Sequence, residues 1–230
     1  MSTALITGAS QGLGLALTNA FAARGWNLVV DARDGTRLRE ATRTLPTVVA
    51  IAGDVTDPGH REALAAAAEV FGPLDLLVNN ASELGPSPLP ELARYPLAAL
   101  RTVYETNVVA PLALTQLLLP ALRAAGGTVV NISSDAAVEP YPGWGGYGPS
   151  KAALDHASAI LAAEEPELRV FAFDPGDMRT GMHQRAFPGE DISDRPLAST
   201  VVPAVLRLFD ERPPSGRYRA VDLRAAEVAQ

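Results

Sequence analysis

Short β-branched runs alternate with longer alanine- and leucine-rich segments along this chain, and this alternation constrains the fold more than any other feature. The first six runs are almost continuously apolar, as expected for strands that are covered on both faces. We expect strands at 3–7, 27–31, 47–51, 75–79, 127–133, 168–174 and 217–221. We expect helices at 12–24, 35–44, 58–70, about 96–124, 147–164 and 199–210.

Strands that alternate with helices predict the α/β class, with right-handed crossovers, a parallel sheet and helices on both faces. The runs listed above predict a doubly wound, Rossmann-like sheet of about seven strands. Three segments rich in proline and glycine, at 84–90, 139–149 and 186–196, read as loops and not as domain boundaries. Residues 1–230 are therefore expected to form a single domain.

Composition excludes several classes of function. There are no cysteines and the three histidines are far apart, so thiolate chemistry is excluded and no metal site is expected. The formal net charge of −7 argues against a nucleic-acid partner. The N-terminus lacks the pattern of a secretory signal. The apolar stretch 108–125 is interrupted by Pro111, Gln116, Pro120 and Arg123, which indicates a buried helix and not a membrane span. We expect a cytoplasmic protein that does not bind a membrane.

The glycine-rich stretch TGASQGLG (7–14) directly follows the first strand. In a doubly wound sheet this turn carries the phosphate site, because the next helix offers free N–H groups and the positive end of its dipole. Gly8, Gly12 and Gly14 would permit positive φ angles and a close approach of the backbone to a ligand. The alternative is a tight turn that only joins strand to helix. The position after the first strand favours nucleotide binding.

Tyr147 and Lys151 are four residues apart on a predicted helix, so both side chains leave the same face. A free tyrosine has a pKa of about 10, and a nearby ammonium group stabilises the phenolate and lowers that pKa. The two residues could therefore form a proton-transfer unit. The alternative is a surface pair. The position of the segment, after the fifth strand of a nucleotide-binding sheet, favours the catalytic interpretation.

Further motifs resemble those of the short-chain dehydrogenase/reductase family. Together with the glycine stretch they are NNAS (79–82), Asn107, NISS (131–134), YGPSK (147–151) and PGDMRT (175–180). The resemblance extends over about residues 3–182. It implies the strand order 3-2-1-4-5-6-7, a nicotinamide cofactor, and oxidoreductase activity on CH–OH or C=O groups.

The resemblance also implies a catalytic set made of Asn107, Ser134, Tyr147 and Lys151. Tyr147 would be the general acid for carbonyl reduction or the base for alcohol oxidation, and Lys151 would hold the nicotinamide ribose and tune Tyr147. Ser134 would bond the substrate oxygen. Ser133 is the competing serine, because adjacent side chains on a strand point to opposite faces, and the family spacing favours Ser134. Asn107 would help to hold a water that relays protons to the lysine, or would only mark a local kink.

By the same resemblance the cofactor lies along the carboxyl ends of the strands. The predicted contacts are Gly8, Ser10, Gln11, Gly12, Leu13, Gly14, Arg33, Asp54, Val55, Asn80, Ala81, Tyr147, Lys151, Pro175, Gly176, Met178 and Thr180. Asp54 would bond the adenine, or would only cap the helix near 58. Thr180 would bond the carboxamide and could cap a helix as well.

The end of the second strand bears on the choice between NAD and NADP. An acidic residue there binds the ribose 2′-hydroxyl of NAD, whereas an arginine accommodates a 2′-phosphate. By resemblance, Ala32 occupies the place of the NAD-selecting aspartate, and Arg33 follows it. We expect NADP(H) to be preferred, with NAD(H) as the alternative. Asp31 complicates this assignment, and Arg33 could instead pair with Asp34 in solvent.

We expect the protein to reduce a small ketone or aldehyde by hydride transfer, with Tyr147 as the acid. The alternatives are a 3-oxoacyl thioester reductase, a secondary-alcohol dehydrogenase, and an NADP-binding regulatory protein without turnover. The segment 181–198 is expected to be a loop that covers the substrate. The resemblance further implies a homodimer or homotetramer, assembled through the helices that contain 106–124 and 152–163. The apolar faces of these two segments are equally compatible with packing on the sheet.

Overall fold

Seven parallel strands form one sheet in this computed structural model, which describes residues 1–223. The strands are β1 (Thr3–Ile6), β2 (Asn27–Ala32), β3 (Val48–Ala52), β4 (Leu76–Asn79), β5 (Thr128–Ile132), β6 (Arg169–Asp174) and β7 (Gly216–Arg219). Their order is β3-β2-β1-β4-β5-β6-β7, which confirms the predicted order. The order reverses between β1 and β4, where a doubly wound sheet opens a crevice beyond its carboxyl ends.

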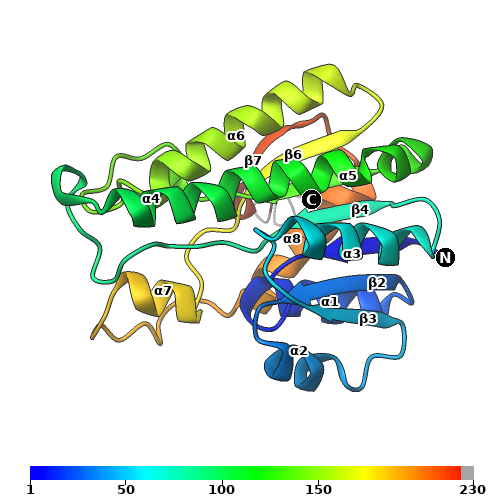
Figure 1. Cartoon of the computed structure of the whole chain (residues 1–230), viewed down its shortest axis with the longest axis horizontal. Helices are drawn as coiled ribbons and strands as arrows, with labels where there is room; N and C mark the ends of the chain where they lie inside the picture. The colour runs from blue at the N-terminus through cyan, green and yellow to red at the C-terminus, as the bar shows by residue number, and fades with distance from the viewer. Residues whose placement is uncertain (224–230) are drawn as a thin grey trace.

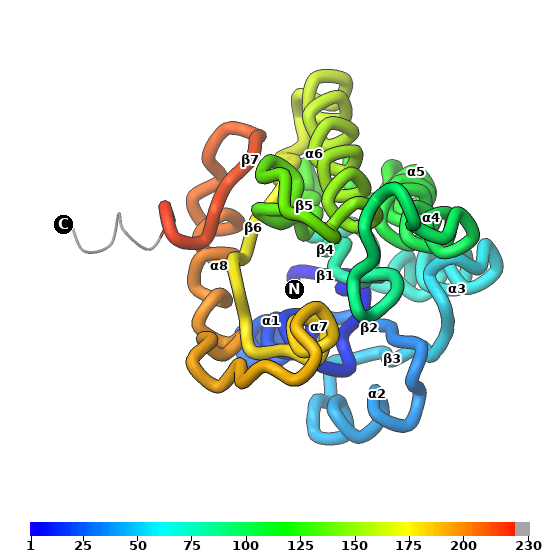
Figure 2. The backbone as a smooth tube through the Cα atoms, turned by 90° about the vertical axis from the view of Figure 1, so that its left-hand side faces the viewer, coloured from blue at the N-terminus to red at the C-terminus, as the bar shows by residue number. Residues whose placement is uncertain are grey.

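Helices pack on both faces of this sheet, as predicted (Figure 1). They are α1 (Gly12–Ala23), α2 (Gly35–Thr42), α3 (Pro58–Glu69), α4 (Leu97–Tyr104), α5 (Ala110–Ala125), α6 (Tyr147–Glu164), α7 (Gly181–Ala186) and α8 (Val202–Glu211), with short turns η1 (Leu92–Arg94), η2 (Glu105–Val109), η3 (Asp135–Ala137) and η4 (Ala198–Val201). Figure 2 shows α1 and α8 on one side of the strands, and α3, α5 and α6 on the other.

The core is divided into two layers because successive side chains of a strand point to opposite faces. Ile6 of β1 packs with Phe21 of α1 and Leu208 of α8 in one layer. Its neighbour Leu5 packs with Leu118 of α5 in the other layer. The strands are therefore apolar on both faces, which explains their nearly continuous apolar runs.

Local signals set the ends of several helices. Asp34 begins α2 by accepting hydrogen bonds from the N–H groups of Thr36 and Arg37. Asp57 begins α3 in the same way, with Pro58 at the first helical position, so the cap near 58 is Asp57 and not Asp54. Gly126, in the left-handed conformation, ends α5.

The helix expected over about 96–124 is present as the continuous segment Leu97–Ala125, and it contains one irregular turn, η2, between α4 and α5. The η2 segment is a π-helical turn that contains Asn107. The wider turn places the Asn107 side chain in the interior, where it is fully buried. Pro111 follows in the first turn of α5, where its missing N–H is tolerated.

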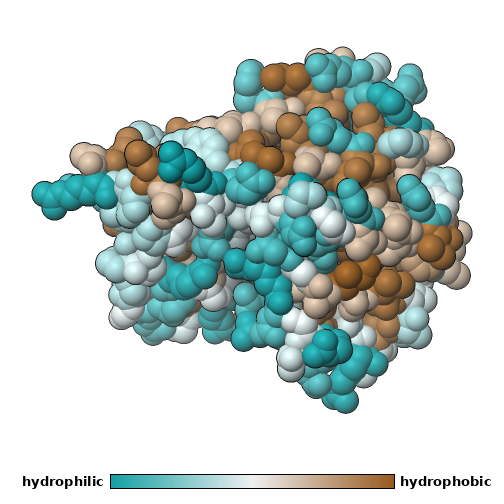
Figure 3. Space-filling model, in the orientation of Figure 1, coloured by the Kyte–Doolittle hydropathy of each residue, from teal (hydrophilic) through white to brown (hydrophobic). Residues whose placement is uncertain are grey.

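The continuous helical segment Leu97–Ala125 has a mean hydropathy of 1.6 and is long and apolar enough to cross a membrane by those two criteria. One side of it packs on the sheet, through residues that include Leu114 and Leu118. The other side exposes Val109, Leu112 and Leu117. Figure 3 shows apolar side chains gathered over this helix. The apolar character of the buried side is accounted for by packing on the sheet.

The segment 181–198 is not a loop throughout. It begins with α7, which Thr180 caps by accepting a hydrogen bond from the His183 N–H at 3.2 Å. A helix of six residues is too short to give a clear apolar period in the sequence.

Candidate active site

Two polar side chains, Asp31 and Asn80, hold the turn between β1 and α1 by hydrogen bonds to its main chain. The Gly8 N–H donates to Asp31 Oδ1 at 2.8 Å. Asn80 Nδ2 donates to the carbonyl oxygens of Thr7 and Gly8 at 2.8 and 3.1 Å. These contacts fix the turn at the carboxyl end of β1 and leave the N-terminus of α1 facing the crevice.

The three glycines of this turn have different tasks. A Cβ atom on Gly14 would lie 2.4 Å from the Gly8 carbonyl oxygen, and one on Gly8 would lie 2.9 Å from Asn80 Nδ2. Both glycines are therefore required by close packing within the protein. Gly12 has a φ of +58° and meets only the Thr180 methyl group at 3.6 Å, so its missing side chain leaves space on the crevice side.

One cleft runs across the carboxyl ends of the strands, and almost all the predicted site residues line it. Those that line it are Gly8, Ser10, Gln11, Gly12, Leu13, Arg33, Asp54, Val55, Asn80, Ala81, Ser134, Tyr147, Lys151, Pro175, Gly176, Met178 and Thr180. Gly14 and Asn107 are the two that do not. Gly14 lies behind the turn, and Asn107 lies behind the loop after β4.

Tyr147 and Lys151 lie on one face of the first turns of α6, as predicted, and both are buried in the wall of the cleft. Lys151 Nζ is 5.4 Å from the centre of the Tyr147 ring and donates to the Ile132 carbonyl oxygen at 2.7 Å. That bond directs the ammonium group toward the end of β5, where Ser134 follows. The helix and the strand end together bring the three side chains to one region of the cleft.

Burial has opposite effects on the two groups, since it disfavours the charged form of each. It lowers the pKa of Lys151 to about 8, with the Asp155 carboxylate opposing the change. It raises the pKa of Tyr147 above the ordinary value, while hydrogen bonds from Ser82 and Ser134 act to lower it. We expected a lowered pKa for the phenol. The pKa is raised instead, because burial outweighs the hydrogen bonds.

Asn107 is the centre of a buried hydrogen-bond network. Its Oδ1 accepts from the Ser82 hydroxyl at 3.1 Å and from the Glu83 N–H at 2.7 Å. Its Nδ2 donates to the Glu83 carbonyl and the Ser150 hydroxyl, both at 2.9 Å. The side chain thus ties the loop after β4 to α6. Because its amide is fully engaged, any contact with a water would have to use the main chain.

The two serines at the end of β5 are distinguished by their neighbours. Ser134 caps η3 and acts on the Tyr147 phenol. Ser133 also lines the cleft, but it is buried and its influence falls on Asp155 and not on Tyr147. This arrangement favours Ser134 as the residue that faces a substrate.

Asp31, at the end of β2, lines the cleft, and both of its carboxylate oxygens have partners within the protein. Its side chain is only 1% exposed, and its second carboxylate oxygen lies 3.0 Å from His60 Nε2. It is therefore engaged within the protein. Arg33 is largely exposed and pairs with Glu83, in the loop after β4, at 3.4 Å, and not with Asp34. Arg37, one turn into α2, also lines the cleft and donates to Gln11 Oε1 at 2.6 Å.

Asp54 lines the same end of the cleft. Its Oδ1 accepts from the backbone N–H and the hydroxyl of Thr56 at 2.9 and 2.8 Å. These hydrogen bonds hold its pKa below the usual range although burial acts to raise it. The carboxylate is thus ionised and held in place at the end of β3.

The opposite end of the cleft is aromatic and acidic. Trp144 packs edge-on against Tyr147 at 5.7 Å between ring centroids and also contacts Phe187. Asp135 accepts from the Tyr141 hydroxyl at 3.0 Å, and His183 lies 3.6 Å from Asp177. This end can receive a small organic group beside the Tyr147 hydroxyl.

Comparisons with known proteins agree with this geometry. Residues 2–191 match the family model described as short chain dehydrogenase. The chain is a member of the short-chain dehydrogenase/reductase family. It is 38% identical over 196 residues to serine 3-dehydrogenase of Agrobacterium fabrum, with 80% of this chain and 78% of that protein covered. It is 37% identical over 199 residues to sepiapterin reductase of Mus musculus, with 79% and 76% covered.

Solved structures lead to the same family. A protein of Shigella flexneri 2a strain 301, solved in complex with NADP, superposes with a TM-score of 0.88 at 28% identity, covering 95% of this chain and 96% of that chain. As a member of this family, the protein is an oxidoreductase that acts on CH–OH or C=O groups.

Sequence reasoning missed several groups of this short-chain dehydrogenase/reductase site. Arg37 could have been found from its position four residues after Arg33 on the predicted helix. Ser82 is the last residue of the NNAS motif and was given no role of its own, whereas it bonds Asn107 and acts on Tyr147. Arg217 lies far from the other motifs in the sequence, and nothing in its neighbourhood indicated a contact with the site.

Proposed function

We propose that this short-chain dehydrogenase/reductase uses NADP(H) to reduce a small ketone or aldehyde, with Tyr147 as the general acid. The observation that carries the proposal is the meeting of Tyr147, Lys151 and Ser134 in one cleft with the glycine turn. A protein that only senses a nucleotide would not need a buried tyrosine and lysine next to a serine hydroxyl.

The residues of the cleft fit a dinucleotide phosphate. The N-terminus of α1 offers N–H groups and the positive end of the helix dipole to a pyrophosphate, and Gly12 leaves room for it. Arg33 and Arg37 offer two guanidinium groups for a 2′-phosphate. Asp31 is engaged with Gly8 and His60, which weakens the case for a carboxylate that selects NAD.

The chain's own residues would perform the proton transfer. When bound, the nicotinamide supplies the hydride. The Tyr147 hydroxyl donates its proton to the carbonyl oxygen, and the Ser134 hydroxyl holds that oxygen. The raised pKa of Tyr147 keeps it protonated, and hence a donor, over the neutral range. Lys151 places a positive charge beside the phenolate that forms, which lowers the cost of the transfer.

The charges of the cleft favour a small carbonyl compound over a 3-oxoacyl thioester. Thioester carriers bear phosphate groups, whereas Asp135 and Asp177 stand at the substrate end. Oxidation of an alcohol is the second candidate, because one relative is named serine 3-dehydrogenase. That reaction would use the same residues, with Tyr147 as the base.

The test is a fluorescence titration with NADPH and NADH, followed by turnover assays that monitor nicotinamide absorbance. The panel contains small ketones and aldehydes, 3-oxoacyl thioesters, and serine and secondary alcohols with NADP. We expect tighter binding of NADPH and turnover with a small carbonyl compound. Tight NADPH binding with no turnover in either direction would contradict the proposal.

A further inference from the structure

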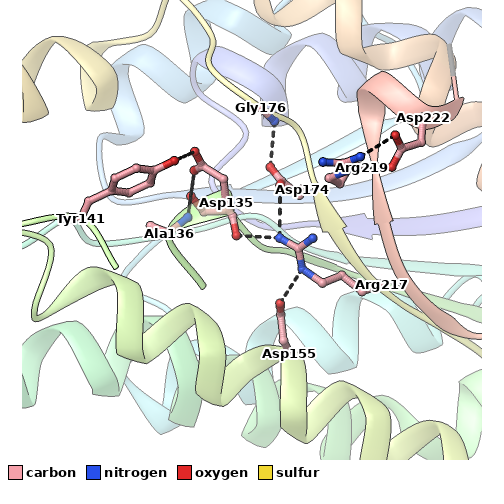
Figure 4. Close-up of polar contacts among 10 residues, drawn as sticks. Asp135, Ala136, Tyr141, Asp155, Asp174, Gly176, Arg217, Arg219 and Asp222 are labelled. Carbon is pink, nitrogen blue, oxygen red and sulfur yellow. Dashed lines mark hydrogen bonds and ion pairs between the residues drawn. The ribbon is translucent and has the colours of Figure 1, made fainter. Parts of the chain in front are cut away.

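Arg217 stands on β7, the last strand of the sheet, where it pairs with Ala172 of β6. Its guanidinium does not line the cleft but lies directly behind it. Nε donates to Asp155 Oδ2 at 3.0 Å, and Nη2 donates to the Ser134 carbonyl oxygen at 2.9 Å and to Asp174 Oδ2 at 3.1 Å. Figure 4 shows the guanidinium between Asp155 and Asp174.

Each of the three partners adjoins a group of the proposed mechanism. Ser134 is itself the substrate-facing serine. Asp155 lies one turn after Lys151 on α6 and acts on its pKa. Asp174 ends β6, and its other oxygen accepts from the Gly176 N–H at 2.9 Å, which fixes the turn that lines the cleft. One guanidinium thus joins the end of β5, α6 and the end of β6.

The two carboxylates, Asp155 and Asp174, are compensated by the positive charge of Arg217. The side chains of Asp155 and Asp174 are 15% and 4% exposed, and Arg217 is the cation paired with both of them within residues 1–223. A buried carboxylate without a partner is costly, so removal of one cation leaves two unfavourable charges. Burial raises the pKa of Asp155, and Arg217 opposes that change.

We propose that Arg217 is a positioning residue of the oxidoreductase reaction: it holds Ser134 and the Pro175–Gly176 turn at a fixed separation and neutralises Asp174 behind Tyr147. This inference rests on the proposed function. It assigns a role to a residue of the C-terminal strand, outside the matched range 2–191.

The charged groups around Tyr147 define how loss of Arg217 would act. Lys151 faces it from α6, Asp135 from η3 and Asp174 from the end of β6, and both carboxylates act to raise its pKa. The same cleft is lined by Asp177 and His183. Without Arg217, the charge of Asp174 is no longer balanced by its ion pair, so ionisation of Tyr147 becomes harder.

The test compares Arg217→Gln with Arg219→Gln, a control on the same strand whose ion pair with Asp222 is exposed. Arg219 also feels the charge of Asp174, but its guanidinium donates hydrogen bonds to Asp222. We expect Arg217→Gln to lower kcat at least about tenfold and to change the Kd for NADPH less than about threefold. We also expect it to move the alkaline limb of carbonyl reduction, where Tyr147 loses its proton, to higher pH.

Two further variants separate positioning from folding. In the Arg217→Gln background, Asp174→Asn should return the alkaline limb toward the wild-type position, because the unbalanced charge is removed. Arg217→Lys keeps the positive charge but loses the planar guanidinium group. The alkaline limb should therefore stay at the wild-type pH while kcat falls. If Arg217→Gln does not fold, Asp174→Asn alone should move the alkaline limb to lower pH, because the Asp174 charge acts to raise the pKa of Tyr147. The inference would be overturned if Arg217→Gln left kcat and the pH of the alkaline limb unchanged, or if Asp174→Asn did not move that limb.

Hydrogen–deuterium exchange gives a readout that does not depend on turnover. The peptide that contains Gly176 should exchange faster in Arg217→Gln than in Arg219→Gln, because Asp174 no longer fixes the turn. Equal exchange would overturn the inference even if the enzyme is active. A wild-type protein without turnover but with this difference in exchange would contradict the proposed function, and it would still support the role of Arg217 in holding the Pro175–Gly176 turn.

Discussion

At the scale of the residue, burial sets the chemistry of the site. Tyr147 and Lys151 are almost inaccessible, and burial moves the two pKa values in opposite directions, each toward the neutral form. A neutral phenol is a proton donor, and a lysine with a pKa of about 8 can change its charge near physiological pH. The fold therefore prepares the pair for proton transfer at a cost in stability.

That cost is measurable for Lys151, whose pKa falls from 10.5 to about 8 on folding. Between these values the unfolded chain binds more protons than the folded chain, so the contribution to stability increases as the pH rises. We expect the free energy of unfolding of the wild type, relative to Lys151→Met, to rise by up to about 3 kcal/mol from pH 7 to pH 11. Urea titrations at several pH values measure this, and a pH-independent difference would disprove it.

The two arginines at the adenosine end give a second prediction. Arg33→Ala and Arg37→Ala should each weaken NADPH binding about 10- to 100-fold, because each would lose a charge-assisted hydrogen bond to phosphate. NADH binding should change less than about threefold. Arg43→Ala is the control, since Arg43 pairs with Glu40 at the surface. Equal losses for both cofactors would refute the assignment of these arginines.

At the scale of the element, the π-helical turn η2 gives the loop after β4 its shape. Four hydrogen bonds of Asn107 join Ser82, Glu83 and Ser150. Sequence patterns suggested only a kink, because a π turn has the same composition as the helices on either side of it. The helix α7 was missed for a related reason, since it spans less than two turns.

Removal of the Asn107 side chain should destabilise the protein. Asn107→Ala leaves the Glu83 N–H and other buried groups without partners, so we expect a loss of about 2–4 kcal/mol in the free energy of unfolding. Thr102→Ala is the control, because its hydroxyl bonds only within α4. Urea denaturation followed by circular dichroism compares the two variants. A loss as small as that of the control would show that the network does not stabilise the loop.

At the scale of the whole molecule, the alternation of strands and helices predicted the parallel sheet, and the family resemblance supplied the strand order and most of the cleft residues. Parallel strands place their carboxyl ends together whatever their separation in the chain. Contacts that depend on side-chain reach were not predictable. Arg217 meets Ser134 across 83 residues, and Arg33 meets Glu83 across 50. Nothing in the local pattern of either arginine specifies its partner.

The exposed apolar face of α5 bears on assembly. Leu112 and Leu117 are 44% and 42% exposed, and we expect them to be covered in a homodimer or homotetramer. Light scattering on the purified protein should give a mass above that of one chain, and Leu112→Glu with Leu117→Glu should reduce it to the monomer. A wild-type protein that is monomeric at micromolar concentration would exclude this assembly.

The central claim is that the Tyr147 hydroxyl transfers the proton, and Tyr147→Phe tests it most directly. The substitution removes one oxygen from a buried ring, so NADPH titration should give a Kd within about threefold of the wild type. With NADPH bound and a carbonyl substrate of the wild type present, we expect the rate of NADPH oxidation to fall about 100- to 10,000-fold. A variant that binds NADPH and keeps a rate close to that of the wild type would contradict the account.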